Sequence, residues 1–470
     1  MPATSDERSL AQATIEEIGE RIRQRDLSPV EVTQLTLDRI GRLNSTINAY
    51  YTVFAEQALA LARSAEAEIA AGVYRGPLHG VPIAIKDIYE SGPTTCGSKS
   101  LAGYVAERDC AAVRRLRAAG AIVVGKTATY EFAFGVQTRA SHFAPTLNAW
   151  DARRECGGSS SGTAGAIAAG LAYAGMGTCS GGSIRWPAQC CFHVGLKPTY
   201  GRVSRAGIYP LAWSLDHPGP LARTVTDAAY MLQGCAGYDP DDPASADVPV
   251  PNFASKLGRA IKGMRIGVLR DLFEEGCDPK VRATFEAALP VFERLGARIV
   301  TVPTISHAQL TAIALPLLWS EAGAVHRSNL RQRGGDYNPH TRQSLLWGLL
   351  VSAGYSNLAN RARAQVTAAL QQALHAQADV FVLPTTCFQS PPLVLDDTPG
   401  FGARLGRGAL HTAIFNITGA PAIQVPCGWD ADGLPVGMQI SAAAFDEETM
   451  VQVAYAYEQE AGWFRQRPAI

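Results

Sequence analysis

Two turns rich in glycine and serine, joined by a segment of small residues, restrict the fold of this chain most. Residues 157–162 read Gly-Gly-Ser-Ser-Ser-Gly and residues 181–183 read Gly-Gly-Ser. Between them, residues 163–174 are mainly Ala and Gly, which predicts a buried helix that other backbone segments approach closely. Each turn can direct a hydroxyl and several backbone N–H groups into one cleft. This arrangement suits attack on a carbonyl carbon.

A serine hydroxyl is a weak nucleophile by itself, so such a site also needs a base. The nearest histidine, His193, has apolar neighbours typical of a core histidine, and neither candidate serine lies in a Gly-x-Ser-x-Gly motif. Lys86 is the other option, because it ends the apolar, strand-like run 81–85. Burial lowers the pKa of a lysine, so Lys86 is a candidate to accept a proton at neutral pH.

Motifs along most of the chain resemble those of the amidase signature family. They are Gly80-Val-Pro-Ile-Ala-Ile-Lys-Asp87, the two Gly-Gly-Ser turns with Ile184-Arg185, and residues 195–202, 219–224, 419–423 and 433–439. The resemblance implies an α/β fold in which one large mixed β-sheet is wrapped on both faces by α-helices. The helical spacing of apolar residues before Gly72 predicts an N-terminal helical layer at residues 1–72 that packs on a single catalytic core at 73–470.

The same resemblance implies a Ser-Ser-Lys triad. Ser183 is expected to be the nucleophile, Ser159 a bridging serine that follows a cis peptide bond, and Lys86 the ultimate base. The oxyanion hole is expected to consist of the backbone N–H groups of Ser180, Gly181, Gly182 and Ser183. These roles imply a serine hydrolase that cleaves amide C–N bonds through an acyl-enzyme. Esters and carbamates (urethanes) would pass through the same oxyanion.

One position departs from the family pattern. Cys179 stands where family members usually carry an aspartate, and that aspartate commonly pairs with the arginine that is Arg185 here. Arg185 is therefore expected to find another partner or to face water. The three triad residues themselves are all present.

Two alternatives to a free-standing amidase remain. Ser204, Gly207 and Ser214-Leu215-Asp216 also resemble the A subunit of a tRNA-dependent glutamine amidotransferase. In that branch a carboxylate is expected to bind the substrate amino group, and our alignment places Ala409 there, which favours the free-standing amidase. The second alternative is a homologue that binds without catalysis, and the complete triad argues against it.

Two further motifs have a structural and a functional interpretation. Residues 120–127 match the phosphate-loop pattern Gly-x-x-x-x-Gly-Lys-Thr, but an expected strand occupies the middle of the motif, so we predict no phosphate site. Tyr130, Phe132 and Phe134 are candidates for lining the substrate cleft, and an interpretation as core aromatics is equally open.

The composition narrows the classes of partner. The chain has 42 Lys plus Arg and 42 Asp plus Glu, so net charge favours neither nucleic acid nor an anionic membrane. The polar start and the lack of a long apolar run predict a cytoplasmic protein. The ten cysteines follow no metal-binding spacing and are expected to be reduced, so we predict no metal or other cofactor. The expected substrate is a small neutral amide, ester or carbamate, and the oligomeric state stays open.

The remaining sequence predicts how helices and strands alternate. Helices are expected at 14–25, 28–42, 53–71, 109–119, 278–296, 446–460 and through most of 303–375. Strands are expected at 121–124, 264–269, 297–302, 380–383, 423–425 and 436–440. Residues 239–252 read as a loop, and the long loop 390–408 is a candidate cover for the site.

Overall fold

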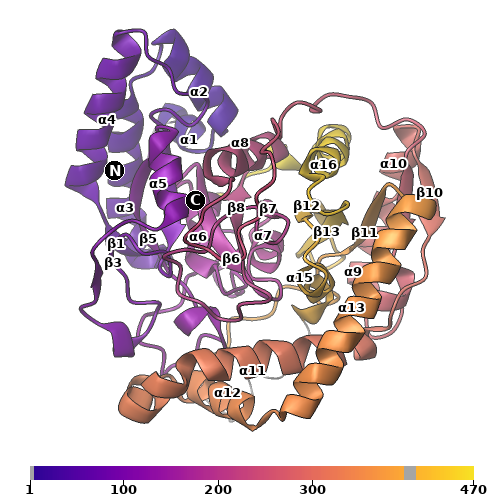
Figure 1. Cartoon of the computed structure of the whole chain (residues 1–470). Coiled ribbons are helices and arrows are strands. Elements are labelled where there is room, and N and C mark those ends of the chain that lie inside the picture. The colour runs from indigo at the N-terminus through magenta and orange to yellow at the C-terminus, as the bar shows by residue number, and fades with distance from the viewer. Residues whose placement is uncertain (1–4, 396–408) are drawn as a thin grey trace.

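A mixed β-sheet runs through the computed structural model, which describes residues 5–395 and 409–470 (Figure 1). Within these residues the sheet has 11 strands in the order β1-β5-β2-β6-β8-β7-β12-β13-β11-β9-β10. Their bounds, in that order, are Tyr50–Val53, Ile122–Thr127, Pro82–Lys86, Ala174–Cys179, His217–Ala222, Val194–Lys197, Ala422–Trp429, Pro435–Ser441, Val380–Pro384, Arg265–Val268 and Arg298–Thr301. Strands β5, β2 and β6 are parallel neighbours, as are β11, β9 and β10, while the central pairs are antiparallel.

Helices cover both faces of this sheet, which confirms the predicted fold class. Strand β6 shows the two faces clearly. Its Gly175 lies against Thr163, which is in the first turn of helix α6 (Ser161–Ala168). The next residue, Met176, points to the other side and belongs to the core cluster that includes Leu232 of helix α8 (Val225–Cys235).

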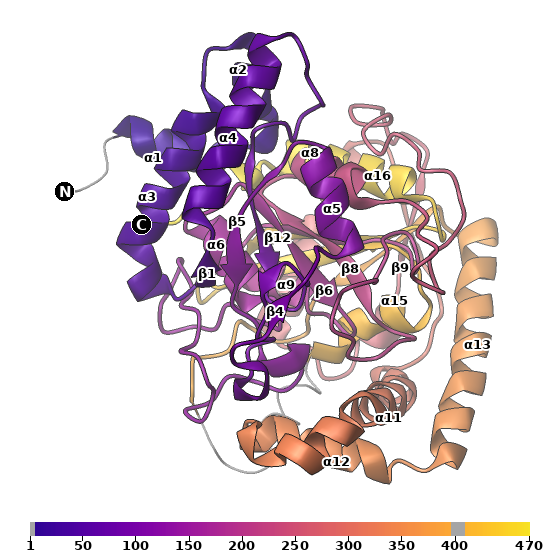
Figure 2. The same ribbon diagram turned by 60° about the vertical axis from the view of Figure 1, so that its left-hand side comes forward.

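The N-terminal segment packs against one end of the sheet (Figures 1 and 2). It contains helices α1 (Ser5–Ala11), α2 (Ile15–Gln24), α3 (Pro29–Ile47) and α4 (Ala55–Ala70). Helix α3 begins as predicted, with the Ser28 side chain accepting from the first-turn N–H groups and Pro29 in the first turn. Strand β1 of this segment pairs with β5, so the first 72 residues also add a strand to the main sheet. The division at residue 72 stays a prediction.

The small-residue segment is a buried helix, but a shorter one than predicted. All eight residues of α6 are buried, and a Cβ on its Gly162 would lie 2.2 Å from the backbone nitrogen of Ala128. The prediction of helix beyond residue 168 is wrong. Gly170 adopts φ of 67°, a left-handed conformation that ends a helix, and residues 174–179 form strand β6 instead.

The second half of the chain has the predicted order of strands and helices, except that one predicted helix is divided in two. Strands β9 and β10 are parallel, and the helix between them is divided at Pro290 into α9 (Pro279–Ala288) and α10 (Pro290–Arg294). Proline lacks the N–H that a continuous helix needs. Three long helices, α11 (His307–Arg333), α12 (Pro339–Leu350) and α13 (Ala353–Ala376), then form an outer layer (Figure 2). Of the predicted loop 390–408, residues 396–408 lie outside the described residues.

The other helices and 3-10 turns are short or flank the sheet. Four further helices complete the layers, which are α5 (Ala111–Ala118), α7 (Arg185–Cys190), α15 (Ile414–Ile417) and α16 (Glu447–Ala461). All ten cysteines are free thiols, and all but the half-buried Cys277 are buried. Within the residues that the structure describes, no helix has both the length and the apolar character needed to cross a membrane.

Candidate active site

The candidate catalytic residues lie where β2 and β6 end. These two strands are parallel neighbours, so Lys86 at the end of β2 and Thr178 near the end of β6 reach the same edge of the sheet. Ser159 precedes helix α6 and approaches this edge from the turn 157–162. The fold therefore brings together residues that are up to 92 positions apart in the sequence.

Lys86 is completely buried and forms two hydrogen bonds. Its Nζ donates to Ser159 Oγ at 2.7 Å and to Thr178 Oγ1 at 3.0 Å. The peptide bond between Gly158 and Ser159 is cis. Burial lowers the pKa of Lys86 to about 7, although the negative charges of Cys179 and Asp216 partly oppose this shift. A lysine with this pKa is neutral in a substantial fraction of molecules at pH 7.

Ser183 lies in the loop between β6 and α7 and is half-buried. In the described part of the chain its hydroxyl does not belong to the hydrogen-bonded group of Lys86, Ser159 and Thr178. Among the same residues, the backbone N–H groups of Gly181, Gly182 and Ser183 donate no hydrogen bond. Free N–H groups next to a partly accessible hydroxyl are suited to bind an oxyanion.

Ser180, the remaining residue of the expected oxyanion hole, is anchored by a carboxylate. Its Oγ donates to Asp216 Oδ1 at 2.5 Å, and the backbone N–H groups of Leu211 and Ala212 donate to the other carboxylate oxygen. Burial raises the pKa of Asp216 to about 6, despite these hydrogen bonds. Asp216 therefore fixes the start of the loop that carries Ser183.

Arg185 is buried beneath this loop and has other partners, which is the first of the two expected outcomes. It donates to Gln439 Oε1 at 2.7 Å, to Asn416 Oδ1 at 2.6 Å and to Cys179 Sγ at 3.3 Å. Burial raises the pKa of the Cys179 thiol, but the Arg185 guanidinium outweighs this effect, and the net pKa lies below its ordinary value. Asn416 also donates to the backbone oxygen of Cys179 at 2.7 Å.

The three aromatic candidates for the substrate cleft have different surroundings. Tyr130 is buried, its hydroxyl donates to Glu155, and its ring occupies the space that a Cβ on Gly158 would need. Phe132 is buried among the rings of Tyr209, His326 and Tyr337, and Phe134 is also buried. Tyr130 is thus next to the turn that carries Ser159, while Phe132 lies within an aromatic cluster. A role of these side chains in substrate binding stays a prediction.

The phosphate-loop pattern is part of the sheet, as predicted. Residues 122–127 form β5, and the buried Lys126 pairs with Asp87 at 3.3 Å and donates to the backbone oxygen of Tyr89. A strand uses its N–H groups in the sheet, so they are not free to hold a phosphate.

A match to a family model shows to which protein family the chain belongs. The family model described as Amidase matches residues 31–451. The chain belongs to the amidase signature family. Members of this family act on C–N bonds, and the shared fold and motifs agree with the geometry above.

Relatives of this amidase family member carry two kinds of name. The A subunit of glutamyl-tRNA(Gln) amidotransferase from Geobacter sp. strain M21 is 38% identical over 473 residues, covering 96% of this chain and 97% of the relative. Six further relatives with the same name are 37% or 38% identical. An amidase of Pseudomonas putida is also 38% identical, covering 98% and 99%. The solved structure of the peptide amidase PAM with chymostatin has 30% identity and a TM-score of 0.82, covering 97% and 99%.

Three residues around the site of this family member have contacts that the sequence did not predict. Thr178 contacts Lys86, Asp216 holds Ser180, and Asn416 contacts both Cys179 and Arg185. Strand alternation offers a signal for the first, because Thr178 lies two residues before Ser180 and faces the same side. The other two come from distant segments, and their contacts depend on the packing of the whole sheet.

Proposed function

We propose that this protein is a serine hydrolase that cleaves amide C–N bonds through Ser183, Ser159 and Lys86. The observation that carries the proposal is the 2.7 Å hydrogen bond between a completely buried lysine and Ser159 Oγ. A buried lysine that is neutral near pH 7 can accept a proton, and the serine next to it can pass that proton on.

The proposed reaction has two stages. In the first, Ser183 Oγ loses its proton through Ser159 to Lys86 and attacks the carbonyl carbon. The N–H groups of the loop stabilise the oxyanion, the C–N bond breaks, and the amine takes the proton back through Ser159. In the second stage, water attacks the acyl-enzyme by the same route. Esters and carbamates would pass through the same intermediates.

A second candidate is the A subunit of a glutamyl-tRNA(Gln) amidotransferase, and the comparisons favour it over the free-standing amidase that the sequence analysis prefers. Most of the relatives described above carry that name, and they match over nearly the whole chain. In this case the amide would be that of glutamine, and the protein would work with partner subunits. Against it stands Ala409, aligned where the sequence analysis expects a carboxylate in that branch.

One experiment tests the chemistry, and a second separates the two candidates. Purified protein is assayed with chromogenic amides, esters and carbamates and with glutamine, and Ser183→Ala serves as the inactive control. The proposal fails if no amide is cleaved, or if Ser183→Ala is as active as the wild type. Co-purification from the native host then shows whether the protein is part of a complex. A stable complex with glutaminase activity supports the amidotransferase, and cleavage of other amides by the isolated chain supports the free-standing amidase.

A further inference from the structure

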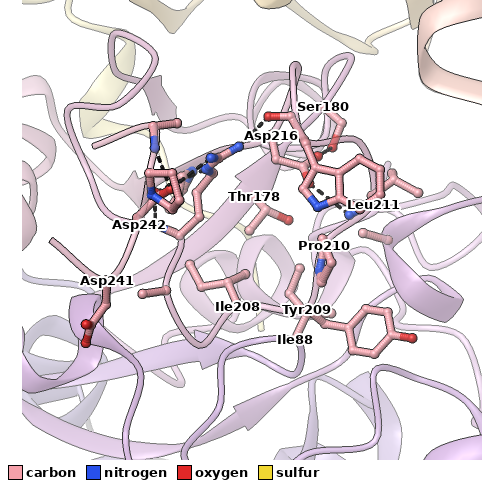
Figure 3. A pocket seen from close by; sticks show the side chains of 17 residues that line it. Ile88, Thr178, Ser180, Ile208, Tyr209, Pro210, Leu211, Asp216, Asp241 and Asp242 are labelled. Carbon is pink, nitrogen blue, oxygen red and sulfur yellow. Dashed lines mark hydrogen bonds and ion pairs between the residues drawn. The ribbon is translucent and has the colours of Figure 1, made fainter. Parts of the chain in front are cut away.

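A cavity of about 500 Å³ borders the end of strand β6 (Figure 3). Most of its lining comes from three parts of the chain, which are Thr178 with Ser180, residues 205–206, 208–211 and 213, and residues 241–244. In Figure 3 the Thr178 side chain lies at the centre of the view, and the Ser180–Asp216 pair lies at its upper right. The ammonia that a glutaminase releases would leave nearly all of this volume empty.

One hydrogen bond separates the cavity from the candidate base. Thr178 Oγ1 lines the cavity and accepts from Lys86 Nζ at 3.0 Å. In the proposed reaction the leaving nitrogen takes its proton from Ser159, which Lys86 holds at 2.7 Å. The proton donor of the leaving nitrogen and the Thr178 wall of this cavity are therefore hydrogen-bonded to the same lysine.

The walls of the cavity combine apolar surface with an excess of negative charge. Apolar side chains predominate, among them Ile88, Ile208, Leu211 and Trp213, and Trp213 is 49% exposed. Arg205 is paired with Asp242 at 2.9 Å, so these two charges compensate each other.

Two further carboxylates of the lining form no ion pair in the described part of the chain. There Asp216 accepts hydrogen bonds only from neutral donors, although the charges of Arg205 and Lys86 act on it. The exposed side chain of Asp241 forms neither an ion pair nor a hydrogen bond with the residues that the structure describes. An apolar cavity with such carboxylates is complementary to a hydrophobic ammonium ion.

We infer that this cavity binds the amine half of the substrate, so that the preferred substrates are secondary amides of hydrophobic primary amines. This inference rests on the proposed function. The Ser183 Oγ–carbon bond forms in the attack, the C–N bond then breaks, and the proton that Ser183 released ends on the amine nitrogen. The free amine then takes a second proton from the buffered solvent near neutral pH and is held as an ammonium ion. A cavity for such a group favours the free-standing amidase over a glutaminase, which releases ammonia.

A binding experiment tests the cavity without catalysis. Benzylammonium chloride and the neutral benzyl alcohol are titrated into the Ser183→Ala protein by calorimetry. Benzylammonium is expected to bind at least tenfold more tightly than benzyl alcohol. Ala206→Phe, which fills the cavity and keeps the backbone hydrogen bonds of Ala206, is expected to weaken benzylammonium binding at least tenfold. Ala254→Phe, at a half-buried alanine outside the cavity, is the matched control and should bind as before.

A charge variant tests the electrostatic part of the inference. Asp241→Asn is expected to weaken benzylammonium binding two- to fivefold and to leave benzyl alcohol binding unchanged. Asp247→Asn removes a charge from an exposed residue of the same loop outside the cavity, and it should have no effect. Absence of benzylammonium binding, or equal binding by the wild-type and Ala206→Phe cavities, would overturn the inference.

Kinetics separate failure of this inference from failure of the proposed function. A primary amide and the N-benzyl amide of the same acid are compared in wild type and Ala206→Phe. We expect the variant to lose at least tenfold in kcat/KM for the N-benzyl amide and less than threefold for the primary amide. Labelling of Ser183 by a small fluorophosphonate, unchanged in the variant, shows that the nucleophile is intact. Equal losses on both amides would overturn the inference and leave the proposed function standing, whereas no turnover of either amide by the wild type would contradict the function itself.

Discussion

Cys179 Sγ lies 3.3 Å from a guanidinium nitrogen of Arg185, and both side chains are completely buried. Within the described residues, Arg185 forms no ion pair with a carboxylate, and its other partners are the neutral amides of Asn416 and Gln439. Arginine stays charged in proteins, and although burial raises the pKa of the Cys179 thiol, the guanidinium beside it brings that pKa below its ordinary value. The pair lies directly before the loop that carries Ser183.

Cys179→Ala is therefore expected to lower the free energy of unfolding by about 2 kcal/mol, because it removes a buried hydrogen bond of the charged guanidinium. Cys179→Asp places a carboxylate beside the guanidinium and should lose less. Urea denaturation at pH 7.5 measures the three proteins. Cys427→Ala is the matched control, because burial raises the pKa of that thiol and it has no cationic partner among the described residues. Equal losses for Cys179→Ala and Cys427→Ala would show that the contact with Arg185 adds no stability.

The pH dependence of the reaction should follow the ionisation of Lys86. A base must be deprotonated to act, and the pKa of Lys86 is lowered to about 7, so kcat/KM is expected to rise through about pH 7 and then level off. Lys86→Arg keeps a positive charge but cannot lose it near neutrality, and Lys86→Met keeps the length without the charge. Both should be about 10²-fold or more below wild type on an amide. Melting curves check that the variants fold. An Arg variant with more than about a tenth of wild-type activity would show that Lys86 only supplies charge.

Thr178→Val should shift that pH profile. The Thr178 hydroxyl accepts a hydrogen bond from Lys86 and so favours the charged lysine, and its removal lowers the pKa of Lys86 further. The rising limb of kcat/KM should move to lower pH, and the plateau should fall about fivefold if the lost hydrogen bond is worth about 1 kcal/mol. Thr178→Ser keeps the hydroxyl and should restore both values. A lower plateau with no change in the position of the limb would indicate a purely structural role.

Ser183 is expected to be the acylated residue. A serine-directed fluorophosphonate should label it, and peptide mapping identifies the site. Ser183→Ala should lower kcat by several orders of magnitude, as removal of a nucleophile from a cooperating group typically does. A label on Ser159 or Ser161 would reassign the nucleophile.

The sequence by itself determined the features that depend on local patterns. The glycine-rich turns, the apolar run that ends at Lys86 and the order of the motifs predicted the fold class, the buried lysine and the strand that excludes a phosphate loop. Local signals also predicted the start of α3 at Ser28-Pro29, because a cap and a first-turn proline act within a few residues. The end of α6 at Gly170 could have been read from the sequence as well, since glycine is the usual residue at a helix C-terminus.

The tertiary structure alone decided which distant groups meet. Asn416 and Gln439 are more than 230 positions from Arg185, and they reach it because the C-terminal segments fold back onto the sheet. The contact of Thr178 with Lys86 depends on two strands, far apart in sequence, becoming parallel neighbours. The cavity beside Thr178 is likewise enclosed by residues 205–218 and 241–244, which only packing brings together. Hydrogen bonds and charge pairs act over a few ångströms in space, so their partners follow from topology and not from spacing along the chain.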